Sequence, residues 1–382
     1  MIIIHNKENC CGCSACAERC PKQCIIMEED GEGFLYPRID VGRCVKCGRC
    51  EKVCPVIHQN RPHKPVRVYA AKNPVEKIQM ESSSGGIFSM LAERIIQTGG
   101  VVFGARFSER WNVIHDYTET IEGITLFRGS KYSQSVVGDN YIKAELFLKQ
   151  GRQVLFTGTP CQIAGLHCFL RKSYDNLLTV DVVCHGVPSP LIWRKYLKEF
   201  TGGHSIKKIF MRDKSTKWPT YSFRITDGKQ NIIYERAADN IYLKGFLANL
   251  YLRPACYTCA FRSGKSGSDL TIADYWGIAN HHPEFDDPKG VGLVLIHTAK
   301  GSEIYRQIGA LSVETTYEQA LQGNTGIEKS VPRPKYRNEF WANYDSEGLR
   351  IIEPICKKMQ PSIVRLCLRW GKRYIKRIIS RN

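Results

Sequence analysis

Short runs of apolar residues along the chain alternate with longer stretches in which apolar residues recur at helical spacing. Apolar runs bounded by turn residues predict strands, and the periodic stretches predict amphipathic helices. Strands are expected at 66–72, 101–107, 111–118, 154–158, 177–186 and 291–298, and helices at 86–100, 139–151 and directly after 158. The alternation of strands and helices predicts an α/β or α+β domain built on a mixed sheet.

The first 60 residues follow a different pattern, with two apolar runs around Asp30 and Gly31 within the segment 24–39. This arrangement predicts a hairpin. The segment 58–65 is polar and contains proline, as expected of a linker. We therefore expect a small domain at 1–58, a large domain at 66–335 and a C-terminal tail at 354–382.

The composition is that of a globular protein, with 43% hydrophobic and 24% charged residues. The N-terminal apolar run is too short for a signal peptide, and the chain has no run of about 18 apolar residues. These features favour a cytoplasmic protein. In that compartment the 17 cysteines are expected to bind metal or clusters rather than to form disulfides.

The clearest motif is a duplicated pattern of cysteines, C-x2-C-x2-C-x3-C-P, which ends once at Pro21 and once at Pro55. In this pattern three close thiolates bind one cubane and the fourth binds the other cubane. One predicted 4Fe-4S cluster is held by Cys10, Cys13, Cys16 and Cys54, and a second by Cys44, Cys47, Cys50 and Cys20. Zinc sites use separated cysteine pairs and do not call for the fourth Cys-Pro, so the repeat resembles a bacterial two-cluster ferredoxin domain.

Several nucleotide-binding motifs are absent from the large domain. No G-x-G-x-x-G lies between a predicted strand and helix, and the sequence has no Walker A motif and no C-x3-C-x2-C radical motif. The segments 81–88 and 127–135 could instead hold a phosphate or a flavin, because serines and glycines precede a helix in the first and Lys131 supplies a cation in the second. A plain helix cap and a solvated loop are the alternatives.

Four cysteines of the large domain form a second group. Cys161 and Cys184 each end a predicted strand, and Cys256 and Cys259 form a C-x2-C pair. Four thiolates suit either a cubane or a zinc ion. A nucleophilic pairing of Cys161 or Cys184 with His185 is a further alternative.

Five segments in this order resemble the beta subunit of coenzyme F420 (deazaflavin) hydrogenases and dehydrogenases: SSSGGIF, GSKYSQS, FTGTPCQIAGL, VCHGVPSP and SDLTIADYWGI. The plant 7-hydroxymethyl chlorophyll reductase is related to this family. The resemblance implies an α+β protein in which a small two-cluster ferredoxin-like domain precedes a larger mixed α/β flavin-binding domain. It also implies a third 4Fe-4S cluster on Cys161, Cys184, Cys256 and Cys259. The implied FAD contacts are Ser83, Ser84, Gly85, Gly86, Ser130, Lys131, Tyr132 and Thr159.

The function implied by the resemblance is that of an iron–sulfur flavoprotein oxidoreductase. Clusters carry one electron at a time, whereas an organic substrate usually takes two, and a flavin converts between them. A ferredoxin-like redox partner is expected, and the family resemblance suggests a link to surface-polysaccharide biosynthesis. The alternative is a non-catalytic electron-transfer module that docks on a partner enzyme. A nucleic-acid binder is favoured by net charge alone, because no recognition motif accompanies it.

The C-terminal residues 361–382 separate into an apolar and a basic arc on a helical wheel, and the last 50 residues carry about half of the net charge of +18. Such a helix is typical of a peripheral attachment to anionic lipid, here at the inner face of the membrane. A helix packed on its own domain, with a solvated basic face, is the alternative.

Overall fold

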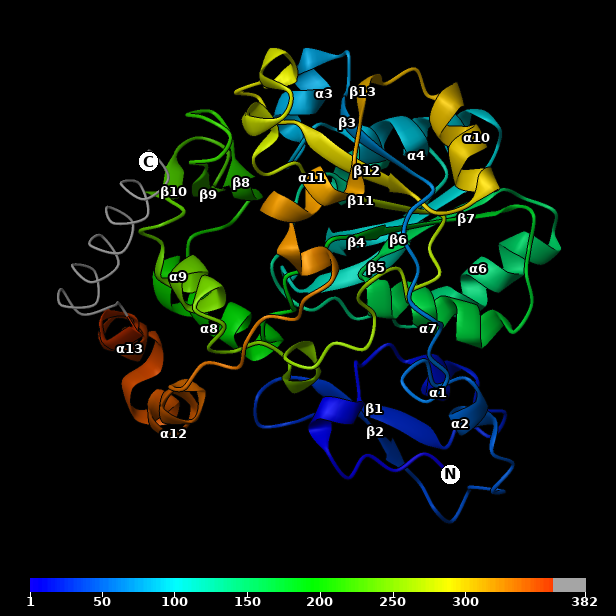
Figure 1. The fold of residues 1–382 in the computed structure, drawn as a ribbon. Coiled ribbons are helices and arrows are strands. Elements are labelled where there is room, and N and C mark those ends of the chain that lie inside the picture. Colours follow the sequence, from blue (N-terminus) through cyan, green and yellow to red (C-terminus); the bar gives the residue numbers. More distant parts are fainter. Residues whose placement is uncertain (360–382) are drawn as a thin grey trace, which may run out of the picture.

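Three sheets organise residues 1–359, the part of the chain that the computed structural model describes (Figure 1). The predicted membrane-binding residues 361–382 lie outside the described residues. None of the helices within 1–359 is long and apolar enough to cross a membrane. The boundaries 1–58, 66–335 and 354–382 stay predictions.

The small N-terminal domain contains the predicted hairpin. Strands β1 (Ile25–Glu29) and β2 (Leu35–Ile39) pair antiparallel, from Ile25 opposite Ile39 to Glu29 opposite Leu35. The turn is held by Asp30, whose Oδ1 accepts hydrogen bonds from the backbone N–H groups of Glu32 and Phe34. Two single-turn helices flank the hairpin, α1 (Ala15–Glu18) and α2 (Arg49–Lys52).

The large domain is built on an eight-stranded mixed sheet in the order β13-β3-β12-β11-β7-β6-β4-β5. Strands β4, β6, β7 and β11 run parallel, and the strands outside them pair antiparallel. The bounds are β3 (Arg67–Lys72), β4 (Val101–Phe107), β5 (Val113–Thr118), β6 (Val154–Gly158), β7 (Leu177–Val182), β11 (Leu270–Asp274), β12 (Gly292–Ile296) and β13 (Leu311–Thr315).

Helices cover both faces of this sheet (Figure 1). On one face, α4 (Ile87–Gln97) and α10 (Ala299–Gln307) pack on residues such as Val102 and Leu155. On the other, α6 (Asn140–Lys149) and α7 (Pro160–Leu170) pack on Phe103 and Phe156. Consecutive residues of one strand therefore pack into the hydrophobic cores on opposite faces of the sheet, because side chains alternate along a strand. The remaining helices of this domain are α3 (Glu76–Glu81), α5 (Ile124–Phe127) and α11 (Tyr317–Gly323).

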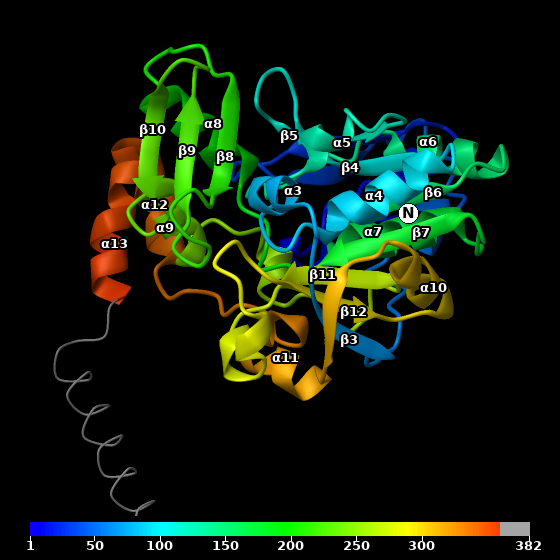
Figure 2. The same cartoon turned by 90° about the horizontal axis from the view of Figure 1, so that it is seen from above.

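A third unit stands beside the large sheet (Figure 2). Its antiparallel sheet, in the order β10-β9-β8, packs with four helices around an aromatic core that includes Trp193, Tyr196, Phe223 and Tyr242. The elements are α8 (Pro190–Phe200), β8 (Lys208–Asp213), β9 (Ser222–Thr226), β10 (Asn231–Arg236), α9 (Ile241–Leu247), α12 (Arg337–Glu347) and α13 (Ile352–Met359). The hydrophobic pattern predicts none of these elements.

The predicted fold class is confirmed, because a small ferredoxin-like domain precedes a larger domain with a mixed sheet. Each strand and helix expected from the hydrophobic pattern is present, with ends shifted by a few residues. The small domain lies under the face covered by α6 and α7 (Figure 1), and its residues Cys11, Cys13, Ala15 and Val53 belong to the same hydrophobic core as α7.

Candidate functional site

The two cysteine repeats have matching backbones. Gly12 and Lys46, at the same position of each repeat, have positive φ of 71° and 52°, and Ser14 and Gly48 have φ of 66° and 70°. Each repeat contains a single-turn helix that carries its third cysteine, Cys16 in α1 and Cys50 in α2. Repeated left-handed residues turn the chain around a common centre, so the internal duplication is also present in the structure.

The cysteines predicted to hold the second cluster line one small cavity. Its walls include Cys20, Cys44, Cys47 and Cys50, together with Cys24. Cys20 comes from the first repeat and the other three ligands come from the second, as the crossed arrangement predicts. Cys47 is exposed to solvent, whereas Cys50 is buried. This group is therefore the one nearest the outer edge of the molecule.

The cysteines predicted to hold the first cluster are also close together. Burial, and then the neighbouring thiols of Cys10 and Cys54, raise the pKa of Cys16 to about 12. Burial is the main cause of the raised pKa of Cys54, and Cys10 adds to it. Thiols in such surroundings stay protonated at neutral pH, and metal binding is the event that removes the proton. The assignment of both clusters to these residues stays a prediction.

The four cysteines of the large domain line one cavity of about 220 Å³. Cys161, Cys184, Cys256 and Cys259 all contribute to its wall, next to Cys11 of the small domain. Across residues 1–359, no group of three or more His, Cys, Asp or Glu side chains is gathered closely enough to bind a single metal ion. The structure brings the four residues together, and the third cluster stays a prediction.

The fold explains why Cys161 and Cys184 meet. Cys161 lies in the first turn of α7, directly after β6, and Cys184 follows β7. Strands β6 and β7 are adjacent and parallel, so their carboxyl ends reach the same edge of the sheet. The 3-10 turn Pro254–Cys256 and the residues after it carry the other two thiols to that edge. This is the edge at which open α/β sheets generally bind ligands.

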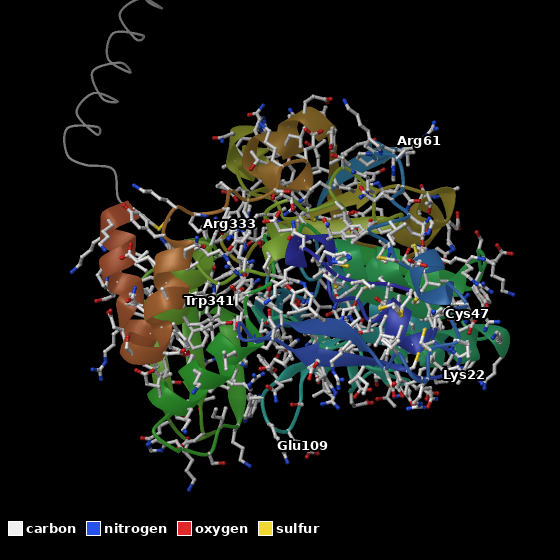
Figure 3. All side chains as sticks on the ribbon, turned by 90° about the horizontal axis from the view of Figure 1, so that it is seen from below. Lys22, Cys47, Arg61, Glu109, Arg333 and Trp341 are labelled. Atoms are coloured by element: carbon white, nitrogen blue, oxygen red, sulfur yellow. The ribbon has the colours of Figure 1, made fainter. Side chains whose placement is uncertain are left out.

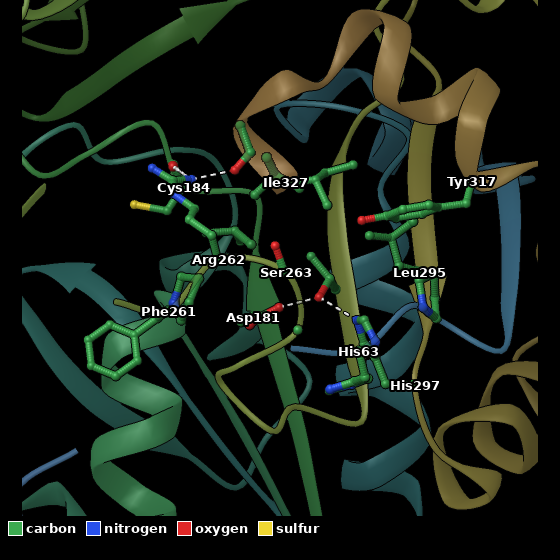
Figure 4. Close-up of a pocket in the computed structure, with 17 residues that line it drawn as sticks. His63, Asp181, Cys184, Phe261, Arg262, Ser263, Leu295, His297, Tyr317 and Ile327 are labelled. Carbon is green, nitrogen blue, oxygen red and sulfur yellow. Dashed lines mark hydrogen bonds between the residues drawn. The ribbon is translucent and has the colours of Figure 1, made fainter. Parts of the chain in front are cut away.

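A buried polar network supports the loop that carries Cys184 (Figure 4). Arg262 Nη1 donates hydrogen bonds of 2.5 Å to the carbonyls of Cys184 and Gly326. Beyond it, Thr271 Oγ1 donates to Asp181 Oδ1 at 2.5 Å and lies 2.9 Å from Nε2 of His297. Burial raises the pKa of Asp181 to about 6 and lowers the pKa of His297 to about 4. Because Arg262 bonds to both carbonyls at once, it holds the loop of Cys184 against Gly326.

Arg253 lies on the wall of the 220 Å³ cavity and reaches the first repeat. Its Nε donates to the carbonyl of Cys10 at 2.7 Å, its Nη1 to Oε1 of Gln134 at 3.0 Å, and its Nη2 to the carbonyl of Leu35 at 3.0 Å. The Tyr36 ring lies 4.2 Å from the guanidinium carbon. The side chain therefore joins the small domain to the cavity of the large domain.

Helix α7 forms a second connection between the two groups of cysteines. Cys161 lies at its start, and one turn later a Cβ at Gly165 would be only 2.9 Å from Cβ of Cys13. The Cys11 thiol interacts with the thiols of both Cys13 and Cys161. The interaction with Cys11, followed by burial, raises the pKa of Cys161. The first and third groups of cysteines are therefore neighbours across this helix.

The predicted flavin contacts lie in two segments that meet. The hydroxyl of Ser83 accepts hydrogen bonds from the backbone N–H of Ser130 at 2.7 Å and from its hydroxyl at 2.8 Å. Gly86, with φ of 84°, is the residue before α4. Thr159 caps α7 with Gln162, and its hydroxyl lies 3.2 Å from Sγ of Cys161.

Other predicted flavin contacts have structural partners of their own. The Ser84 hydroxyl donates to the carbonyls of Ala273 and Val291, and Gly85 packs against the backbone of β3 and β12. Lys131 Nζ donates to the carbonyls of Phe127, Arg128 and Gly129, and burial lowers its pKa to about 7. Tyr132 packs on Phe246, with ring centroids 4.9 Å apart. All eight assignments stay predictions.

The segment 129–135 links the flavin candidates to the cavity. At one end Ser130 bonds to Ser83 before α4, and at the other Gln134 Nε2 donates to the carbonyl of Cys11 at 3.0 Å.

His185 is the alternative partner for a cysteine nucleophile. Its Nε2 lies 2.7 Å from Oδ1 of Asn249.

The sequence patterns singled out none of Arg253, Gln134, Arg262 and Cys11. Arg253 and Cys10 are 243 positions apart, and Gln134 and Cys11 are 123 apart. No local spacing joins such residues. The only sequence feature near Arg253 is the C-x2-C pair that begins three residues later.

Two family models match the chain. The model for the C terminus of the coenzyme F420 hydrogenase/dehydrogenase beta subunit matches residues 151–318, and a 4Fe-4S dicluster domain model matches residues 9–57. The first match contains the four cysteines that the large domain contributes to the 220 Å³ cavity, and the second contains the complete cysteine repeat.

Among curated proteins, the coenzyme F420-dependent sulfite reductase of Methanocaldococcus jannaschii is 21% identical over 350 residues, which cover 88% of this chain and 52% of that protein. NADH-quinone oxidoreductase subunit I 2 of Geobacter metallireducens is 41% identical over 59 residues, 14% of this chain and 45% of that protein. The chain thus spans about half the length of these relatives. A chain of the F420-reducing NiFe hydrogenase complex of Methanosarcina barkeri aligns with a TM-score of 0.46 and 18% identity, over 72% of this chain and 98% of that one.

Proposed function

The chain belongs to the coenzyme F420 hydrogenase/dehydrogenase beta subunit family and carries a 4Fe-4S dicluster domain, and we propose that it is an iron–sulfur flavoprotein oxidoreductase acting on an organic substrate. In this proposal single electrons enter through the ferredoxin domain and leave in pairs. A bound FAD supplies the conversion between one-electron and two-electron transfer. The two family models relate the chain to redox proteins of this family. The bound flavin and the organic substrate belong to the proposal.

The observation that carries the proposal is the 220 Å³ cavity with four cysteines on its wall. The cavity wall includes Cys11, which shares a hydrophobic core with Cys13 of the first predicted cluster. Gln134, which donates to the carbonyl of Cys11, comes four residues after Ser130, whose hydroxyl bonds to Ser83. The hydroxyl of Thr159 lies 3.2 Å from Sγ of Cys161. A third cluster at this place connects the ferredoxin domain with the flavin candidates.

The residues have distinct roles in this proposal. Cys161, Cys184, Cys256 and Cys259 hold the third cluster, and Arg262 keeps Cys184 in place through its carbonyl. The N–H of Val187 donates a hydrogen bond to Sγ of Cys256 at 3.4 Å, and the hydroxyl of Thr159 lies 3.2 Å from Sγ of Cys161. Such hydrogen bonds stabilise the reduced cluster and tune its potential.

The alternative function is a non-catalytic electron-transfer module. One support is the family match, because the matched model is named for a subunit. The other is that the chain covers only 52% of the length of the related sulfite reductase. Such a module passes single electrons to a partner and needs no flavin of its own.

Flavin content and turnover separate these two functions. Anaerobically purified protein should release FAD on denaturation, and its flavin absorbance should bleach when dithionite reduces the clusters. Ser130→Ala should weaken FAD binding several-fold, because it removes one of two hydrogen bonds to Ser83, whereas Ser173→Ala, at an exposed position, should not. Reduced coenzyme F420 is a first donor to test, since the related sulfite reductase is named for it. Protein that holds clusters but binds no flavin would favour the relay module.

Two finer parts of the proposal rest on the sequence. The family resemblance suggests a substrate from surface-polysaccharide assembly, and the amphipathic pattern of 361–382 suggests contact with anionic lipid at the inner face of a membrane. A protein redox partner is expected, since the matched family is named for a subunit.

A further inference from the structure

The outer edge of the small domain carries a surface that combines apolar and basic side chains around an exposed cysteine. Figure 3 shows Lys22 and Cys47 at this edge. The centre is apolar, because Val41 is 62% exposed and Val45 is 57% exposed. We call this surface the Cys47 face and define it by the exposed residues Lys22, Val41, Arg43, Val45, Lys46, Cys47, Arg49 and Lys52.

The cations of the Cys47 face are close to the second group of cysteines. Lys22, Lys46 and Arg49 line the same cavity as Cys20, Cys44, Cys47 and Cys50. Arg43 adjoins Lys22, since its Nη2 donates to the Lys22 carbonyl at 3.1 Å. The basic side chains therefore surround the most exposed of the predicted cluster ligands.

These charges are not balanced locally. Within residues 1–359, none of the five cations forms an ion pair. The nearby acids are engaged elsewhere, Glu51 with the terminal amine of Met1 at 2.9 Å and Glu28 with Arg38 at 2.6 Å. Asp40 accepts the backbone N–H groups of Gly42 and Arg43. Residues 1–60 as a whole have as many acidic as basic residues, so the positive charge is concentrated on one face.

We propose that the Cys47 face docks an acidic one-electron carrier protein whose redox centre lies against Cys47. This inference rests on the proposed function, because it takes the second cluster to be the entry point for electrons. Electron transfer between proteins requires the two centres to be close, and Cys47 is the exposed ligand. A small apolar centre with a charged rim suits a weak, transient redox complex. The unpaired cations would steer an acidic partner and raise its association rate.

The step itself transfers one electron. The donor centre would be oxidised by one electron, a cluster held by Cys20, Cys44, Cys47 and Cys50 would be reduced by one, and no bond or proton would move. A reduced acidic ferredoxin with a single 2Fe-2S centre is a suitable probe, because it delivers one electron and carries net negative charge.

The test is the second-order rate constant for cluster reduction by this ferredoxin, measured by anaerobic stopped flow at several ionic strengths. We expect the rate to fall as salt is added, because exposed charges are screened beyond about 10 Å at 0.1 M salt. Lys22→Glu/Arg49→Glu should lower the rate at least tenfold at low salt and much less at high salt. The matched control is Lys207→Glu/Lys229→Glu, which makes the same change in net charge at exposed positions next to β8 and between β9 and β10.

Dithionite in excess, a small reductant that needs no docking surface, should reduce the clusters of all three proteins to the same extent. A salt-independent rate, an unchanged rate in Lys22→Glu/Arg49→Glu, or an equal loss in the control would overturn the docking proposal. Binding of the wild type to anionic vesicles that is lost in Lys22→Glu/Arg49→Glu, with no effect on ferredoxin, would assign the face to lipid instead. A protein that shows no cluster signal with dithionite would contradict the proposed function itself.

Discussion

The guanidinium of Arg253 lies against the sulfur of Cys10, with Nη2 3.5 Å from Sγ. Arg253 is only 1% exposed, and all its hydrogen bonds within residues 1–359 go to carbonyls, an amide oxygen and this sulfur, with no carboxylate among them. A buried cation without an anionic partner is costly. Cluster-bound thiolates on both sides of Arg253 would supply the missing negative charge.

Arg253→Met should therefore make the neighbouring clusters harder to reduce. Reduction adds negative charge, and the nearby cation stabilises the reduced state. We expect at least a tenfold change in the ratio of reduced to oxidised cluster, or about 59 mV toward more negative potential for a one-electron couple. Redox titration followed by electron paramagnetic resonance measures this shift.

The matched variant is Arg253→Lys, which keeps the charge and loses the forked hydrogen bonds. It should recover most of the wild-type potential while weakening the contacts with Cys10 and Leu35. If Arg253→Met and the wild type have the same potentials, Arg253 only joins the domains and has no electrostatic role.

Gly165→Ala should loosen the contact between the two domains. An added Cβ would be 2.8 Å from Oη of Tyr141 and 2.9 Å from Cβ of Cys13, so either the helix or the first cysteine loop must move. Overpacking of this kind costs about 1–3 kcal/mol. We expect a lower thermal unfolding temperature and faster proteolysis within the linker 58–65. Gly31→Ala, where no atom lies within 4 Å, is the control and should behave as the wild type.

His115 should make the protein less stable in mild acid. It is buried between Ser135 and the carbonyl of Thr157, and burial lowers its pKa to about 4. Below about pH 6.5 the unfolded chain binds a proton that the folded state excludes, so stability present above pH 6.5 is lost as the pH falls toward 4. The full loss in the free energy of unfolding, reached below about pH 4, is roughly 3 kcal/mol. Urea unfolding at pH 7.5 and pH 5 measures the part of this loss that develops above pH 5.

His115→Gln removes the titrating group and keeps hydrogen-bonding capacity at this position. Its unfolding midpoint should depend less on pH than that of the wild type. The same pH dependence in both proteins would show that other groups, such as His297, account for the acid sensitivity.

The sequence was informative where spacing is local. The cysteine repeats, the hairpin around Asp30 and the strands before Cys161 and Cys184 depend on neighbours within a few residues, and the structure contains them. The third sheet, β8 to β10, is stabilised by an aromatic core drawn from α8, α9 and α12, which no short window contains. Lys131 shows the same limit, because its three carbonyl partners depend on the path of the folded loop and the sequence suggested a free cation.

The most direct measurement is the number of irons per chain after anaerobic reconstitution. Three 4Fe-4S clusters require about twelve irons and as many labile sulfides. Cys161→Ser/Cys184→Ser should retain about eight, with the ferredoxin signals intact, whereas Cys168→Ser, on the same helix but not on the cavity wall, should retain about twelve. Only about eight irons in the wild type, alone or with one zinc per chain, would contradict the account.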